Sequence, residues 1–138
     1  MTPRQRPRSA AGPVAIARWA AVLAWMGVIF FLSAQPDLPH PDVGWAGRLV
    51  SSAAHALEYA VLAVLLAIAL EGRPRSLLIA FLVAVLYGIS DEFHQSFVPG
   101  RTPDVWDVAC DAAGALAALA LWAAWRRHRT RARERASR

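Results

Sequence analysis

Four apolar stretches separated by polar segments make up most of this chain. They cover residues 14–33, 53–70, 76–89 and 105–125. Because an α-helix rises about 1.5 Å per residue, about 20 residues cross a hydrocarbon core that is about 30 Å thick. The first and last stretches reach that length, whereas the middle two reach it only if the polar residues at their outer ends are helical too. The pattern predicts an all-α fold, a four-helix transmembrane bundle.

The basic residues predict an orientation for this bundle. All fifteen are arginines, and thirteen of them lie before or just inside the first stretch, in residues 71–75 (EGRPR), or after the last stretch. Arginine is enriched in the cytoplasmic segments of membrane proteins. Both termini are therefore predicted to be cytoplasmic, N-in and C-in. The glycine and proline of residues 71–75 also predict a tight turn between the second and third helices.

Composition supports a membrane protein and narrows its partners. The chain is 57% hydrophobic and has a mean hydropathy of +0.34. A formal charge of +5 could suggest nucleic-acid binding, but these charges flank apolar stretches, where they contact anionic lipid. We therefore expect a lipid bilayer as partner and no nucleic acid. The predicted organisation is a basic cytoplasmic N-terminus (1–13), one membrane domain (14–125) and a basic cytoplasmic tail (126–138), with both ends disordered.

Residues 1–34 also allow a second interpretation. They combine a basic start, an apolar run and small residues near the end, as a cleaved signal peptide does. Cleavage would leave three spans with a free N-terminus outside. The single cysteine, Cys110, excludes an intrachain disulfide.

Ionisable residues gather at the extracytoplasmic side of this topology. Eight of the ten acidic residues fall there, and residues 87–111 alone contain five carboxylates, a histidine and an arginine between two apolar stretches. Ionisable groups in a membrane span are uncommon and indicate a functional site. The sequence therefore predicts a polar site at the extracytoplasmic side of the bundle.

Three predicted helices supply the side chains of this site. Spacings of three and four place His55, Glu58 and Tyr59 on one face of the second helix. A turn at Pro99-Gly100 could direct Arg101 back toward the carboxylates. The other candidates lie at the outer ends of the third and fourth helices: Tyr87, Asp91, Glu92, His94 and Gln95 on the third, and Asp104, Asp107 and Asp111 on the fourth. Asp104 also stands where a helix N-cap is expected.

Three motifs resemble the VanZ-like family of small integral membrane proteins. They are FFLSAQP (residues 30–36), HALEYAVLA (55–63) and YGISDEFHQSFVPGRTPDVWDV (87–108). The resemblance implies a multi-pass protein of the bacterial cytoplasmic membrane, in a family named for a component associated with low-level resistance to the glycopeptide teicoplanin. Carried over by position, the polar signature of the family falls on His55, Tyr59, Asp91, Glu92, His94, Gln95, Arg101 and Asp107.

The chain departs from the family pattern at two places. Ser51-Ser52 stands where members often have an Asp-Lys pair, so the acidic cluster lacks that lysine. Asp111 stands where members often have asparagine. The resemblance therefore implies no requirement for a negative charge at residue 111.

Two functional hypotheses follow from these residues. The first is a binding or remodelling protein of the cell envelope, whose partner is a lipid-linked envelope precursor or a glycopeptide. Its arginine could pair with a phosphate or carboxylate of that ligand. The candidate ligand-binding residues are Gln35, Tyr59, Tyr87, Gln95, Arg101, Asp104 and Asp111.

The second hypothesis is a membrane hydrolase or transferase acting on an envelope lipid. The candidate catalytic residues are His55, Glu58, Asp91, Glu92, His94 and Asp107. Imidazole and carboxylate ligands suit a divalent metal such as Zn²⁺ or Mn²⁺, which could activate water, and the metal-ligand candidates are His55, Glu58, Asp91, Glu92 and Asp107. A metal-free version would use His55 as a general base. No HExxH or GxSxG motif is present, and the apolar inner halves of the spans disfavour a proton or ion pathway.

Overall fold

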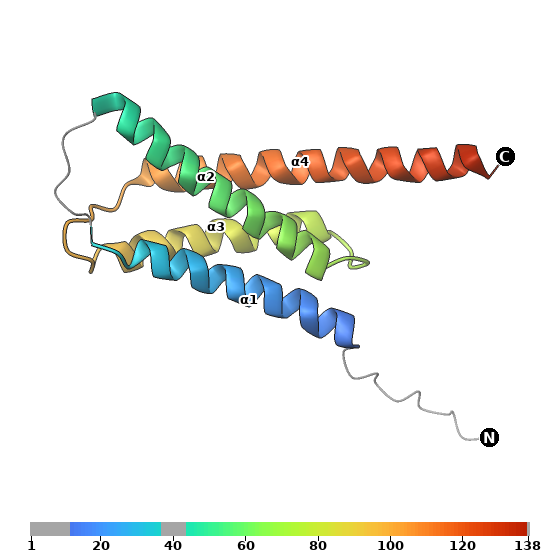
Figure 1. Cartoon of the computed structure of the whole chain (residues 1–138), viewed down its shortest axis with the longest axis horizontal. Coiled ribbons are helices and arrows are strands. Elements are labelled where there is room, and N and C mark those ends of the chain that lie inside the picture. The colour runs from blue at the N-terminus through green and yellow to red at the C-terminus, as the bar shows by residue number, and fades with distance from the viewer. Residues whose placement is uncertain (1–11, 37–43, 138) are drawn as a thin grey trace, which may run out of the picture.

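A computed structural model of the chain describes residues 12–36 and 44–137, which form an all-α four-helix bundle (Figure 1). The helices are α1 (Pro13–Ser33), α2 (Gly44–Ala69), α3 (Ser76–Gln95) and α4 (Val105–Ala136). All four are long and apolar enough to cross a membrane. The predicted fold class and the predicted number of helices are therefore confirmed.

Three helices extend beyond the apolar stretches that predict them. α2 begins at Gly44, and α3 continues past residue 89 to Gln95, so its polar end does belong to the helix. α4 continues to Ala136, so the prediction of a disordered tail is wrong for residues 126–136. Arginine and alanine, which dominate this segment, are among the best helix formers. Residues 1–11 of the predicted N-terminal segment lie outside the described part of the chain.

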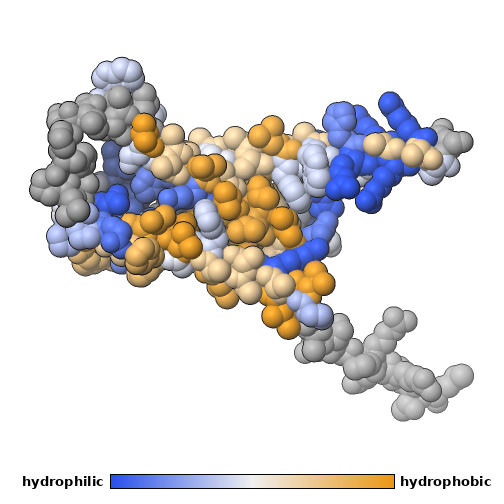
Figure 2. All heavy atoms as spheres, in the orientation of Figure 1, coloured by the Kyte–Doolittle hydropathy of each residue, from blue (hydrophilic) through white to orange (hydrophobic). Residues whose placement is uncertain are grey.

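α2 is the central helix of the bundle. It packs against α1, α3 and α4, whereas no Cα atoms of α1 and α4 come within 8 Å of each other in the described part of the chain. Its inner face contributes Tyr59, Leu62 and Leu66 to the core. Large apolar side chains also remain exposed on every helix, as expected for surfaces that face lipid tails. In Figure 2, hydrophobic residues fill the middle of the visible face and hydrophilic residues gather at its two ends.

The α2 and α4 backbones touch at one point. A Cβ atom built on Gly114 of α4 would overlap the carbonyl oxygen of Ala56 on α2 and lie 2.9 Å from the Ala56 Cα. No side chain larger than hydrogen fits at residue 114 without separating the helices. Association of helices in lipid depends on such small residues, because lipid tails are as apolar as the side chains they would replace.

The bundle has two distinct ends. We call the end where α1 and α3 finish and α2 and α4 begin the acidic end, and the opposite one the arginine end (Figure 1). At the arginine end, the predicted turn in residues 71–75 is confirmed, with Gly72 at φ 82° and Arg75 at φ 56°. The N-in, C-in orientation remains a prediction.

α1 is an integral part of the bundle. Its Val22 and Ile29 are buried in the core, and Ser33 is buried at the acidic end. Cleavage after residue 34 would remove all three.

Replacing Gly114 with alanine tests the α2–α4 crossing. Because the added methyl group overlaps the Ala56 backbone, we expect Gly114→Ala to lower the free energy of unfolding by about 1–3 kcal/mol. Gly27→Ala is the matched control, since no atom lies within 4 Å of a Cβ at that position of α1. Titration with a denaturing detergent measures the free energy of unfolding of both variants. Equal stability of the two would contradict the close crossing.

Candidate functional site

Asp91 is a buried carboxylate at the junction of α1 and α3. The residue is only 4% exposed. Its Oδ2 accepts hydrogen bonds from Ser33 Oγ at 2.6 Å and from Gln95 Nε2 at 3.0 Å. Its Oδ1 is buried and has no hydrogen-bond partner among the described residues. Ser33 thus joins α1 to the acidic end, while one acceptor of Asp91 stays available.

Tyr59 and Asp111 meet against the bare backbone of Gly88. They come from α2 and α4 and are 0% and 2% exposed. A Cβ on Gly88 would lie 3.4 Å from both Asp111 Oδ2 and Tyr59 Cε1, so the glycine leaves these two side chains room beside α3. The Tyr59 hydroxyl and Asp111 Oδ1 are buried without a hydrogen-bond partner in the described structure.

Glu92 connects the end of α3 to the beginning of α4. Its Oε2 accepts a hydrogen bond from the backbone N–H of Asp104 at 2.9 Å. Asp104 in turn caps α4, because its Oδ1 accepts from the N–H of Trp106 at 2.8 Å. The predicted N-cap is confirmed, and it occupies one oxygen of a residue that was also predicted to bind ligand. Near by, Ser52 Oγ donates to Asp107 Oδ1 at 3.4 Å and ties α2 to α4.

The carboxylates of three helices lie within electrostatic range of one another. Asp111 interacts with Asp107, Glu92, Asp91 and Glu58. Glu58 also interacts with His55 and Arg101. The structure therefore brings together acidic side chains that are separated by more than fifty residues in the sequence.

Arg101 lies at the rim of this cluster. The turn that precedes it has Gly100 at φ 82°, a conformation that glycine adopts without strain. Arg101 is half-buried, and its Nε donates to the backbone carbonyl of Gln35 at 3.4 Å. The Pro99-Gly100 turn thus returns the guanidinium toward the other helices, as the sequence predicts.

Three predicted site residues make contacts within the bundle, although His94 Nδ1 has no hydrogen-bond partner among the described residues. The Tyr87 hydroxyl donates to the Met26 carbonyl at 2.7 Å, which packs α3 against α1. The His94 ring lies against Phe30, with 4.3 Å between the ring centroids. Gln35 is exposed just after α1, and its amide donates to the carbonyl of Phe31 near the end of that helix. A ligand would have to displace these contacts to use the groups that make them.

The candidate metal ligands are not grouped around one point in the described structure. Within residues 12–36 and 44–137, no three side chains of histidine, cysteine, aspartate or glutamate are placed to hold one metal ion. The reason is helical geometry, because consecutive residues of a helix point about 100° apart. Asp91 therefore faces Ser33 on α1, while Glu92 faces the start of α4. A metal site formed by His55, Glu58, Asp91, Glu92 and Asp107 stays a prediction.

Three residues of the site were not predicted from sequence. Ser33 and Ser52 are hydrogen-bond donors to Asp91 and Asp107, and Gly88 accommodates Tyr59 and Asp111. Ser33 lies inside the FFLSAQP motif, where a lone hydroxyl at the end of an apolar run is a usable signal. Ser52 and Gly88 carry no comparable signal in one sequence.

A family model described as VanZ/LLP1 matches residues 18–126. The match includes all of the residues that form the acidic end, from Ser33 to Asp111. The chain therefore belongs to the VanZ/LLP1 family and is a multi-pass membrane protein. Neither the curated proteins nor the solved structures contain a significant match to it.

Removing the Ser33 hydroxyl tests the hydrogen bond at the centre of the site. Because Ser33→Ala deprives a buried carboxylate oxygen of a donor, we expect it to lower the free energy of unfolding by about 1–2 kcal/mol. The control is Ser90→Ala, since the Ser90 hydroxyl is exposed and bonds only to Tyr87 O in its own helix. Thermal unfolding in detergent compares them. A smaller loss for Ser33→Ala in an Asp91→Asn background would assign the effect to this pair.

Proposed function

We propose that this protein binds a lipid-linked envelope precursor or a lipid-bearing glycopeptide at the acidic end of its bundle. On this proposal the chain resides in the bacterial cytoplasmic membrane with both termini inside, and the acidic end faces outward. The asymmetric arginines support that orientation. Membership of the VanZ/LLP1 family supports a role in glycopeptide susceptibility, teicoplanin above all.

The observation that carries the proposal is a group of buried polar atoms without partners. They include the Tyr59 hydroxyl, Asp91 Oδ1 and Asp111 Oδ1, each from a different helix, together with the Nδ1 atoms of His55 and His94. A buried polar group that lacks a hydrogen bond costs about 1–3 kcal/mol, and such groups are rare in folded proteins. A ligand that supplies hydrogen-bond partners would recover this free energy.

The chemistry of the cluster defines the polar part of the ligand. Carboxylate oxygens accept hydrogen bonds, so they favour amines, amides and sugar hydroxyls. Glycopeptides and the sugar headgroups of lipid-linked precursors both contain such donors. Arg101 at the rim supplies the opposite charge, which suits a phosphate or carboxylate of the same ligand.

The surface beside the cluster suits the apolar part of the ligand. Phe93 and Phe97 are exposed on the outer side of α3 and the loop that follows, and their rings pack edge to face with centroids 5.2 Å apart. A lipid tail lying in the outer leaflet would contact this pair while the headgroup reaches the acids. The proposed ligand is therefore amphiphilic.

Two tyrosine variants test the proposal with opposite expectations. Tyr59→Phe removes a buried hydroxyl that has no partner, so we expect the free energy of unfolding to rise by about 1–3 kcal/mol while ligand affinity falls about 5- to 10-fold. Tyr87→Phe removes a hydroxyl that is bonded to Met26 O, so we expect stability to fall by about 1 kcal/mol with ligand affinity preserved. Thermal unfolding gives the first quantity. Titration of teicoplanin, and separately of a lipid-linked disaccharide diphosphate, into protein in nanodiscs gives the second.

Comparing the two probes shows which candidate ligand the protein binds, and a growth assay measures the effect on teicoplanin susceptibility in cells. Cells expressing Tyr59→Phe should lose any change in teicoplanin susceptibility that the unmodified protein confers at matched protein levels. Absence of saturable binding of both probes to the unmodified protein would overturn the proposal. Equal loss of affinity in both tyrosine variants would instead assign the effect to packing.

A further inference from the structure

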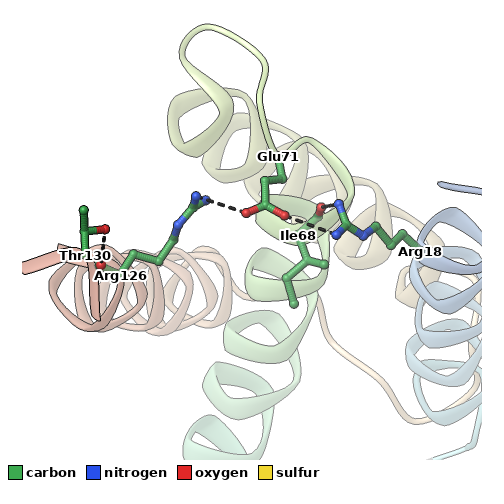
Figure 3. Close-up of polar contacts among 5 residues, drawn as sticks. All are labelled: Arg18, Ile68, Glu71, Arg126 and Thr130. Carbon is green, nitrogen blue, oxygen red and sulfur yellow. Dashed lines mark hydrogen bonds and ion pairs between the residues drawn. The ribbon is translucent and has the colours of Figure 1, made fainter. Parts of the chain in front are cut away.

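The arginine end contains a second polar site, which lies between α1 and α4. The backbones of these helices stay more than 8 Å apart by their Cα atoms in the described structure, and Glu71 bridges them (Figure 3). Glu71 Oε2 lies 3.2 Å from Arg18 Nη2, and Glu71 Oε1 lies 3.0 Å from Arg126 Nη2. Arg18 also donates to the carbonyl of Ile68 at 3.2 Å. The result is a groove between α1 and α4 whose floor is the end of α2.

The groove has more positive charge than its own residues neutralise. Glu71 is its single carboxylate, and both oxygens of Glu71 are paired with Arg18 and Arg126. Arg129 and Arg133 also line the groove, one and two turns further along α4, and neither has a carboxylate partner among the described residues. Two guanidinium groups therefore remain to bind an anion from outside the chain.

Two tryptophans complete the groove at the level where α4 leaves the bundle. The rings of Trp122 and Trp125 stack with 4.9 Å between centroids, and the Arg129 guanidinium lies 5.0 Å above the Trp125 ring. Trp122 Nε1 is buried and has no hydrogen-bond acceptor in the described structure. Tryptophan and arginine are typical of the membrane–water interface, where lipid headgroups offer phosphate and ester oxygens.

The position of the groove indicates that its anion belongs to a lipid. α4 has 32 residues and is about 48 Å long, so it extends well past a hydrocarbon core of about 30 Å. The groove spans the transition from the apolar to the arginine-rich part of this helix. An acyl chain can lie between α1 and α4 beside Ile68 while the headgroup reaches Arg129 and Arg133.

We infer that this groove is a binding site for an anionic phospholipid, whose phosphate pairs with Arg129 and Arg133 and whose oxygens accept from the Trp122 N–H. This site is independent of the ligand proposed for the acidic end. The bound lipid joins α1 to α4 through a second contact beside Glu71, so it stabilises the bundle.

The other face of α4 provides a matched control for this site. Arg131 and Arg135 lie with His128 on a separate surface of the same segment. Replacing Arg129 and Arg133 with glutamine therefore removes the same charge from the same segment as replacing Arg131 and Arg135. Diffuse attraction to an anionic surface would respond equally to the two double variants, whereas a built site would not.

The experiment titrates phosphatidylglycerol into the full chain in a neutral detergent and counts bound lipids by native mass spectrometry. We expect one saturable lipid on the unmodified protein, about 30-fold weaker binding after R129Q/R133Q, and less than about 3-fold weakening after R131Q/R135Q. Trp122→Phe should weaken binding without a change of charge. Phosphatidylcholine should not compete.

Four outcomes would overturn the inference. Equal weakening in the two double variants would indicate diffuse charge attraction only. Unchanged binding after R129Q/R133Q would place the lipid elsewhere. Equal competition by phosphatidylcholine would show that the site does not distinguish an anionic lipid from a zwitterionic one. Binding of soluble glycerol phosphate as tight as that of phosphatidylglycerol would show that the site takes a free phosphate and not a lipid.

Discussion

The crossing of α2 and α4 at Ala56 and Gly114 determines where the other polar groups of the acidic end can lie. One turn beyond Ala56 is Tyr59, and one turn before Gly114 is Asp111. Because the backbones touch at the crossing, these two side chains are held together against Gly88 of the third helix. The acidic cluster is therefore a consequence of backbone contact, and its carboxylates are kept away from lipid, where each would cost about 2–3 kcal/mol or more.

Polar contacts join α1 to α2, to α3 and to the turn between them. These contacts include the hydrogen bonds Ser33 to Asp91, Tyr87 to Met26 O and Trp25 to Glu58 O, and the ion pair of Arg18 with Glu71. In lipid the hydrophobic effect does not drive helices together, so such bonds and close packing replace it. The two proposed binding sites lie at opposite ends of α1. The Ser33–Asp91 hydrogen bond lies at the acidic end, and the Arg18–Glu71 ion pair lies at the arginine end. A ligand at either site would strengthen the attachment of this helix.

The sequence predicts the helices better than it predicts their contacts. Apolar length gives four spans, and carboxylates in those spans give the end of the bundle that holds the candidate site. The direction of each side chain depends on how the helices cross, which a hydrophobic pattern does not specify. His94 thus meets Phe30, and Tyr87 meets Met26, although both belong to the predicted polar set. The helical tail was missed because its arginines suggest solvation, whereas arginine and alanine following a formed helix continue it.

The polarity of the unpartnered atoms limits what the acidic end can accommodate. Asp91 Oδ1 and Asp111 Oδ1 are acceptors, whereas the Tyr59 hydroxyl and the Nδ1 atoms of His55 and His94 can donate or accept. The guanidinium of Arg101 lies at the rim. A bare phosphate placed deep in the cluster would meet carboxylates and be repelled, whereas an amine or hydroxyl there would meet acceptors. An amphiphile with both kinds of group would therefore place its donors toward Asp91 and its anionic group toward Arg101. On the proposed function, this order from rim to interior favours sugar or amine chemistry at the centre of the site.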